Sequence, residues 1–137
     1  MSSKLYQRYI SLKIQDNDAF YLFKSGIFYI FISEDARVVA PLLNLKLTDL
    51  NSSIKKCGFP ISGSQKYFDK IKELNLNVKM VDLANMKFST DLDKYLNGQQ
   101  IFEIVNNFLK INIDELSISQ AYDVLNDLQE ELKKYVM

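Results

Sequence analysis

The feature that most constrains the fold is the segment at 20–32, FYLFKSGIFYIFI, in which two apolar stretches are separated by Lys24, Ser25 and Gly26. Aromatic and β-branched residues favour strands, and a short polar interruption that ends in glycine favours a turn. The second stretch is apolar on both of its alternating faces, which is typical of a strand inside a sheet. The segment therefore predicts two strands joined at Lys24-Ser25-Gly26, the second of them central and covered on both sides.

Further helices and strands are predicted around this hairpin. Apolar residues at helical spacing indicate helices, and shorter alternating stretches indicate strands. Pro41 limits the length of the helix that follows the hairpin. The predicted helices lie at 3–15, 33–43 and 64–74, with strands at 45–50, at the start of 55–65, and at 77–83. Residues 1–83 are thus expected to form one α+β unit.

The C-terminal part of the chain has a different pattern. Residues 84–98 show no clear period, so we interpret them as a connector, and two amphipathic helices follow in 99–137 as a helical hairpin. Ser117 and Gln120 have the spacing of a capping box at the start of the second helix. One face of that helix carries Tyr122, Leu125, Leu128 and Leu132. The same pattern fits packing on this chain's sheet and packing on another chain, where it would serve association.

Several kinds of chemistry lack their usual residues. The chain has no histidine, no phosphate-binding loop and no dinucleotide-binding glycine pattern. Its carboxylate pairs fall at an expected helix start, in a connector and on a solvated helix face, so none needs a catalytic explanation. Cys57 is the only cysteine and has no partner for a disulfide or a metal site, which favours a buried thiol. We therefore expect a protein that is not an enzyme and that has no cofactor or metal.

Charge and hydropathy limit the possible partners. Seventeen basic residues balance seventeen acidic ones, so no global positive field attracts a polyanion. No apolar stretch approaches the roughly 20 residues that a membrane-spanning helix needs. The N-terminus also lacks the apolar core of a secretory signal. A cytoplasmic protein without a membrane partner is expected.

A series of short motifs occurs in order between residues 5 and 83. They are Tyr9 and Lys13, Gly26-Ile27-Phe28-Tyr29-Ile30, Glu34-Asp35-Ala36, Leu42-Leu43, Leu45-Lys46-Leu47-Thr48, Gly58-Phe59-Pro60 and Tyr67-Phe68. The ordered series resembles the N-terminal mismatch-recognition domain, domain I, of bacterial MutS mismatch-repair proteins. The resemblance implies a mixed β-sheet flanked by helices.

The resemblance also implies roles for individual residues. Phe28 matches the family's phenylalanine, which wedges into the duplex and stacks on a mispaired base. Ile30 stands where the family has a glutamate that hydrogen-bonds this base, and isoleucine can accept no hydrogen bond. Lys24, beside the predicted turn, is either a solvated charge or a phosphate contact that would position a duplex without reading its sequence.

The tail carries a second resemblance. Residues 114–134, DELSISQAYDVLNDLQEELKK, are similar to the C-terminal end of MutS, where a helix-loop-helix mediates subunit association. Asp114, Leu116, Ser117, Ala121 and Leu125 hold the comparable positions. Together the two resemblances imply the first and last parts of a MutS chain without the clamp and ATPase between them.

Two classes of function remain open. The first is a DNA-binding module, without ATPase, that recognises mismatched or distorted duplex through Phe28, with a dimer held by the C-terminal helices as one form of it. The second is a protein-interaction module on a MutS-like scaffold that has lost DNA recognition and binds a second copy, a MutS-family partner or another partner. The Gly-x-Phe-Tyr motif favours the first, whereas Ile30 and the zero net charge favour the second. We take DNA binding as the working hypothesis.

Overall fold

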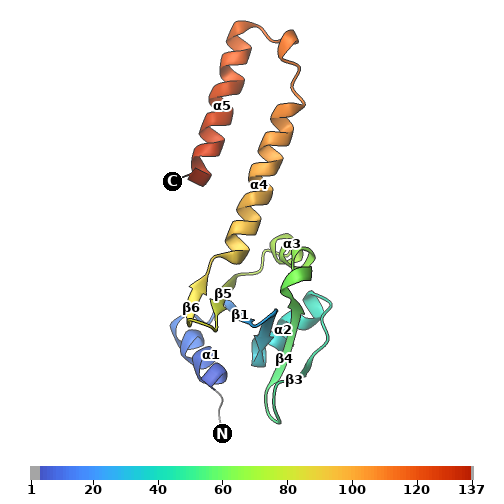
Figure 1. The fold of residues 1–137 in the computed structure, drawn as a ribbon, viewed down its shortest axis with the longest axis vertical. Coiled ribbons are helices and arrows are strands. Elements are labelled where there is room, and N and C mark those ends of the chain that lie inside the picture. The colour runs from blue at the N-terminus through green and yellow to red at the C-terminus, as the bar shows by residue number, and fades with distance from the viewer. Residues whose placement is uncertain (1–3, 137) are drawn as a thin grey trace. The chain divides into compact units, whose positions relative to one another are not determined.

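The computed structural model describes residues 4–136 and has two compact units, Met1–Leu92 (unit 1) and Asp93–Met137 (unit 2). Unit 1 contains a six-stranded sheet in the order β3-β4-β2-β1-β5-β6 (Figure 1). Its elements are α1 (Lys4–Gln15), β1 (Phe20–Ser25), β2 (Phe28–Ile32), α2 (Ser33–Leu42), β3 (Thr48–Asp49), β4 (Lys55–Pro60), α3 (Gln65–Glu73), β5 (Val78–Asp82) and β6 (Lys87–Ser89). Strands β1 and β5 pair in parallel and the other pairs are antiparallel. The predicted α+β class with a mixed sheet and flanking helices is confirmed.

The hairpin of β1 and β2 lies inside the sheet, but its turn begins two residues later and ends one residue later than predicted. Lys24 pairs with Tyr29 and Ser25 pairs with Phe28, so the turn consists of Gly26 and Ile27. Gly26 has φ of 60°, a conformation that glycine adopts without steric cost. The prediction is right for Gly26 and wrong for Lys24 and Ser25, which belong to β1: Lys24 pairs with both Tyr29 and Asp82, and Ser25 pairs with Phe28.

The two faces of the sheet are covered by different helices. On one face, Tyr9 and Leu12 of α1 pack with Tyr21 and Phe23 of β1 in a buried cluster. The other face is covered by α2 and α3, which lie over the β4 side chains of Cys57 and Phe59. Burial raises the pKa of the Cys57 thiol to about 12, as expected for an inert core cysteine. Strand β2 is central as predicted, but its first residue, Phe28, is exposed rather than covered.

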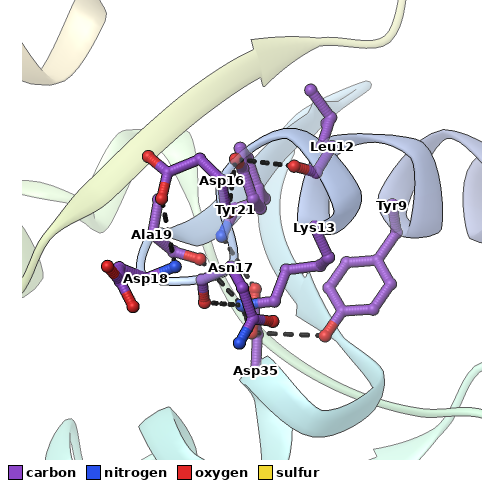
Figure 2. Close-up of polar contacts among 9 residues, drawn as sticks. All are labelled: Tyr9, Leu12, Lys13, Asp16, Asn17, Asp18, Ala19, Tyr21 and Asp35. Carbon is purple, nitrogen blue, oxygen red and sulfur yellow. Dashed lines mark hydrogen bonds and ion pairs between the residues drawn. The ribbon is translucent and has the colours of Figure 1, made fainter.

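A buried cluster of hydrogen bonds joins α1, β1 and α2 at the carboxylate of Asp35 (Figure 2). Tyr9 Oη and Lys13 Nζ donate to Oδ1 at 3.2 and 2.9 Å, and the backbone N–H of Tyr21 donates to Oδ2 at 2.9 Å. Lys13 Nζ also donates to the carbonyl oxygens of Asn17 and Ala19 at 3.0 and 2.8 Å. Tyr9, Lys13 and Asp35, which belong to the sequence motifs, therefore connect α1, β1 and α2.

Two predicted segments differ from the structure. The strand expected at 45–50 is reduced to Thr48–Asp49, because β4 pairs with only these two residues. The segment 84–98, interpreted as an irregular connector, contains β6 and the beginning of helix α4 (Asp91–Leu109). Its backbone is ordered by a strand partner, since β6 pairs with β5, and by Ser89 Oγ, which accepts a bond from the N–H of Asp91.

Unit 2 is a helical hairpin made from the rest of α4, a short 3-10 turn η2 (Ile113–Glu115) and helix α5 (Ile118–Val136). The predicted capping box is confirmed: Ser117 Oγ accepts from the N–H of Gln120 at 3.1 Å, and Gln120 Oε1 accepts from the N–H of Ser117 at 3.0 Å. No side chain between Asp93 and Tyr135 is fully buried. None of the helices within 4–136 is long and apolar enough to cross a membrane.

Candidate nucleic-acid interface

Phe28 is the exposed ring of the hairpin. It follows the turn directly and pairs with Ser25 on one side and Pro60 on the other. Because side chains alternate along a strand, Phe28 and Ile30 share the face of the sheet that α1 covers only in part. Phe28 is 46% exposed, whereas the other five aromatic residues in 20–31 are buried or half-buried. The hairpin therefore presents one ring and buries or half-buries the others.

Beside Phe28 lies an open groove with a volume of about 420 Å³. Ile30 and Gly58 form part of its lining on the sheet. A Cβ on residue 58 would lie 2.4 Å from the carbonyl oxygen of Tyr29 and 2.8 Å from Cγ2 of Ile30, so only glycine allows β4 to approach β2 this closely. The glycine of the Gly-x-Pro motif thus lets β4 lie close against β2 next to the exposed ring.

Two lysines line the same groove. Lys46 precedes β3, and Lys56 lies in β4 on the face of Gly58. Within residues 4–136, neither takes part in an ion pair, whereas the neighbouring Lys55 is paired with Asp49. Both ammonium groups are therefore available to an anionic ligand such as a phosphate backbone.

The zero net charge of the chain is the sum of two unequal parts. Residues 1–92 carry 13 basic and 9 acidic side chains, a net charge of +4, and residues 93–137 carry 4 and 8, a net charge of −4. Unit 1 is therefore basic, and the charge argument against a polyanionic ligand does not hold for it.

Lys24 lies on the opposite face of the sheet from Phe28. Its Nζ is 3.2 Å from Oδ2 of Asp91, and Tyr29 Oη donates to the same oxygen at 2.9 Å. Although burial raises the pKa of the Asp91 carboxyl, the hydrogen bonds from Tyr29 and Lys24 outweigh it and hold this pKa below its ordinary value. The structure thus brings Phe28 and Ile30 together and separates Lys24 from them.

Lys46 and Lys56 were not among the site residues expected from the sequence. Lys56 precedes Gly58 by two residues, so strand alternation alone places both on one face. Strand alternation cannot place Lys46 on this face, because residues 45–47 do not form the strand that was predicted there. A site search that started from Gly58 and counted in steps of two could have found Lys56.

The four residues expected to mediate association lie on α5 in different surroundings. Tyr122 and Leu125 are 71% and 57% exposed. Leu132 is half-buried, and Leu128 is turned towards α4, where it lines a cavity with Ile104 and Phe108. In the described part of the chain, no cluster of three or more cysteine or acidic residues could hold a metal ion.

Comparison with known proteins gives a consistent match to one family. A sequence model of MutS domain I matches residues 3–107. The DNA mismatch repair protein MutS of Streptococcus suis (strain 98HAH33) is 38% identical over 80 residues, which are 56% of this chain and 9% of that protein. The MutS protein of Desulfosudis oleivorans is 31% identical over 85 residues, 59% of this chain and 10% of the relative. The chain thus spans about a tenth of the length of these relatives.

Proposed function

The chain belongs to the MutS domain I family, and from this premise we propose that it is a non-catalytic module, without an ATPase, that binds mismatched or otherwise distorted duplex DNA. The observation that carries the proposal is the exposed ring of Phe28 beside a groove that two unpaired lysines line. The relatives at 31–38% identity are named as mismatch-repair proteins, which supports the same ligand.

In the proposed mechanism the ring of Phe28 and the two groove lysines have different roles. The ring of Phe28 enters a base step and stacks on a base, an interaction worth roughly 1–3 kcal/mol. This gain offsets the cost of unstacking, which is lowest where a base pair is already disrupted. Lys46 and Lys56 contact phosphates and fix the position of the duplex without reading its sequence. Preference for distorted DNA then arises from Phe28 alone.

Ile30 determines how the inserted ring discriminates. It lies on the same face as Phe28 and is half-buried, so it offers the opened base an apolar contact but no hydrogen bond. Without a polar group that tests the edge of the base, the identity of the mispair has little influence. We therefore infer that affinity follows how easily a site unstacks, with an unpaired nucleotide bound at least as tightly as a mispair.

Fluorescence anisotropy at low salt tests this function. The full chain is titrated into labelled duplexes that are identical except for a matched pair, a mispair or one unpaired nucleotide. The proposal predicts tighter binding to both distorted duplexes than to the matched one. Equal affinity for all three duplexes, or no binding to any, would contradict it.

The two groove lysines give a separate prediction. The double variant Lys46→Ala/Lys56→Ala should weaken binding to matched and distorted duplexes by the same factor, because phosphate contacts do not depend on sequence. Loss of two such contacts should also reduce the slope of log K against log salt by about 1.8. The matched control is Lys72→Ala/Lys87→Ala on α3 and β6, which removes two exposed, unpaired lysines that do not line the groove. If the control variant weakens duplex binding by the same factor, the duplex does not bind specifically in the groove.

A second candidate function is protein association through unit 2. The specific observation in its favour is the exposure of large apolar side chains on the hairpin, among them Phe102, Leu109 and Tyr122 at 69–72%. Such exposure on neighbouring helices is typical of an interaction surface. The two functions use different units of the chain, so each can be tested without the other.

A further inference from the structure

The groove beside Phe28 has an apolar lining that is in place before any ligand binds. Leu5 comes from α1, Ile30 from β2, and Leu50 from the segment after β3. All three side chains are half-buried and pack against the buried cluster around Tyr21. Because this packing already restricts their rotamers, little side-chain entropy is lost when a ligand contacts them.

The polar side chains of the lining are mainly hydrogen-bond donors. The ammonium groups of Lys46 and Lys56 only donate, whereas the hydroxyls of Ser25 and Thr48 donate or accept. Ser25 and Thr48 belong to β1 and β3, which are separated in the sheet by β2 and β4. Among the described residues that line the groove, none has a carboxylate or amide side chain. Those in the middle of the groove, on β2 and β4, therefore include no side chain that accepts a hydrogen bond.

The size of the groove suits a single base. Its volume of about 420 Å³ lies within the roughly 300–1,000 Å³ of pockets that bind small molecules. Gly58 has no side chain, so the part of the groove over β4 is not filled. Proteins that displace a base hold it in a pocket, where apolar side chains stack on it and polar groups contact its pairing edge. The groove offers both kinds of contact next to the ring that opens the stack.

We propose that this groove holds the base displaced by Phe28 and selects an uncharged base whose pairing edge carries only hydrogen-bond acceptors, as in thymine alkylated at N3. The inference rests on the proposed function, because Phe28 must first open the site. Thymine itself would bring its N3–H against Ile30, and a buried donor without an acceptor weakens binding. An alkyl group at N3 removes this donor and adds apolar contact, while both carbonyl oxygens of the base can accept from the lysines.

The positive charge of the groove restricts this selection to neutral bases. Adenine alkylated at N1 carries a positive charge, which the ammonium groups of Lys46 and Lys56 repel. It also keeps the two donors of its amino group. Alkylation of adenine at N1 should therefore bring no gain in affinity, although it blocks the pairing edge as fully as alkylation of thymine at N3.

Anisotropy titrations with four labelled duplexes test this selection. The full chain is titrated into duplexes that differ only in one unpaired nucleotide, which is thymine, N3-methylthymine, adenine or 1-methyladenine. Because this nucleotide has no partner in any of the duplexes, the methyl group changes its contacts and not its pairing. N3-Methylthymine should bind about tenfold more tightly than thymine, the order of effect of removing one buried donor without a partner. 1-Methyladenine should bind no more tightly than adenine.

Two outcomes would overturn this inference and leave the proposed function intact. One is that N3-methylthymine binds no more tightly than thymine while both duplexes bind more tightly than a matched one. The other is an equal gain for 1-methyladenine, which would mean that the methyl group acts through stacking and not through the groove. Equal binding of unpaired thymine and a matched pair would instead contradict the proposed function and this inference with it.

Substitutions in the groove test where the base lies. Ile30→Gln adds an amide oxygen that can accept from N3–H without a change in charge, so the preference for N3-methylthymine should fall from about tenfold to about one. Leu50→Gln adds the same group beside β3 and keeps the test valid if Ile30→Gln does not fold. Leu47→Gln is the matched control and should keep the preference, because Leu47 is exposed and does not line the groove. If the folded groove variants also keep it, the base does not lie in the groove and the proposal is overturned.

Discussion

Asp35→Ala is expected to lower the free energy of unfolding of unit 1 by about 3–5 kcal/mol, the range seen when one partner of a buried ion pair is removed. The carboxylate is almost fully buried and accepts hydrogen bonds from Tyr9, Lys13 and the backbone N–H of Tyr21. Alanine would leave all three donors without this acceptor (Figure 2), and the donors of Tyr9 and Tyr21 are buried. Because these donors come from α1 and β1, both elements should lose their attachment to α2.

Urea unfolding followed by circular dichroism measures this effect. Glu34→Ala is the matched control, because Glu34 is the preceding residue of α2, is exposed, and pairs with the exposed Arg37 one turn away. Such a surface pair contributes at most about 1 kcal/mol, so the control should remain close to the original protein. Equal midpoints for the two variants would show that the buried cluster does not stabilise the fold.

Phe28→Ala should weaken binding to a distorted duplex by about 5- to 150-fold, which corresponds to the roughly 1–3 kcal/mol of base–aromatic stacking. Binding to the matched duplex should change little, because the phosphate contacts of Lys46 and Lys56 remain. The preference for distorted DNA should therefore disappear. The side chain is 46% exposed, so we expect little change in the stability of the fold.

The control for this variant is Ile27→Ala in the neighbouring turn position. Ile27 is 72% exposed and equally apolar, but it does not line the groove. It should leave the preference for distorted DNA intact. If Ile27→Ala and Phe28→Ala reduce binding equally, the turn acts as a general apolar contact and the ring has no special role.

The sequence predicted the hairpin well because its pattern is strictly local. Alternating faces and a glycine that must adopt positive φ follow from a dozen consecutive residues. The exact turn depended on β5, which lies more than 50 residues away and pairs with β1 through Lys24. Local patterns do not show such long-range strand pairing, so Lys24 and Ser25 were assigned to the turn and not to β1.

The same error explains the misplaced lysine of the candidate site. With the turn at Gly26 and Ile27, Lys24 lies opposite Tyr29 and so belongs to the face opposite Phe28. Strand alternation has a period of two, so a shift in the turn changes which residues can act together. The choice of Phe28 did not depend on the turn, because it came from the family motif.

The net charge shows a second limit of prediction from the sequence. A total of zero is correct for the chain but describes neither unit, since unit 1 carries +4 and unit 2 carries −4. The boundary after Leu92 lies inside helix α4, where the composition does not change abruptly. A sum over all 137 residues therefore concealed the positive charge of unit 1, which favours an anionic ligand.

The central claim is that the ring of Phe28 enters a disrupted base step. It is tested most directly with 2-aminopurine placed beside an unpaired nucleotide, because the emission of this base rises when it loses stacking neighbours and changes when an aromatic ring stacks on it. Addition of the protein should change the emission in the distorted duplex but not in the matched one, and Phe28→Ala should abolish the change at protein concentrations that saturate binding. An equal change with Phe28→Ala, or none with the original protein bound, would contradict the insertion of this ring.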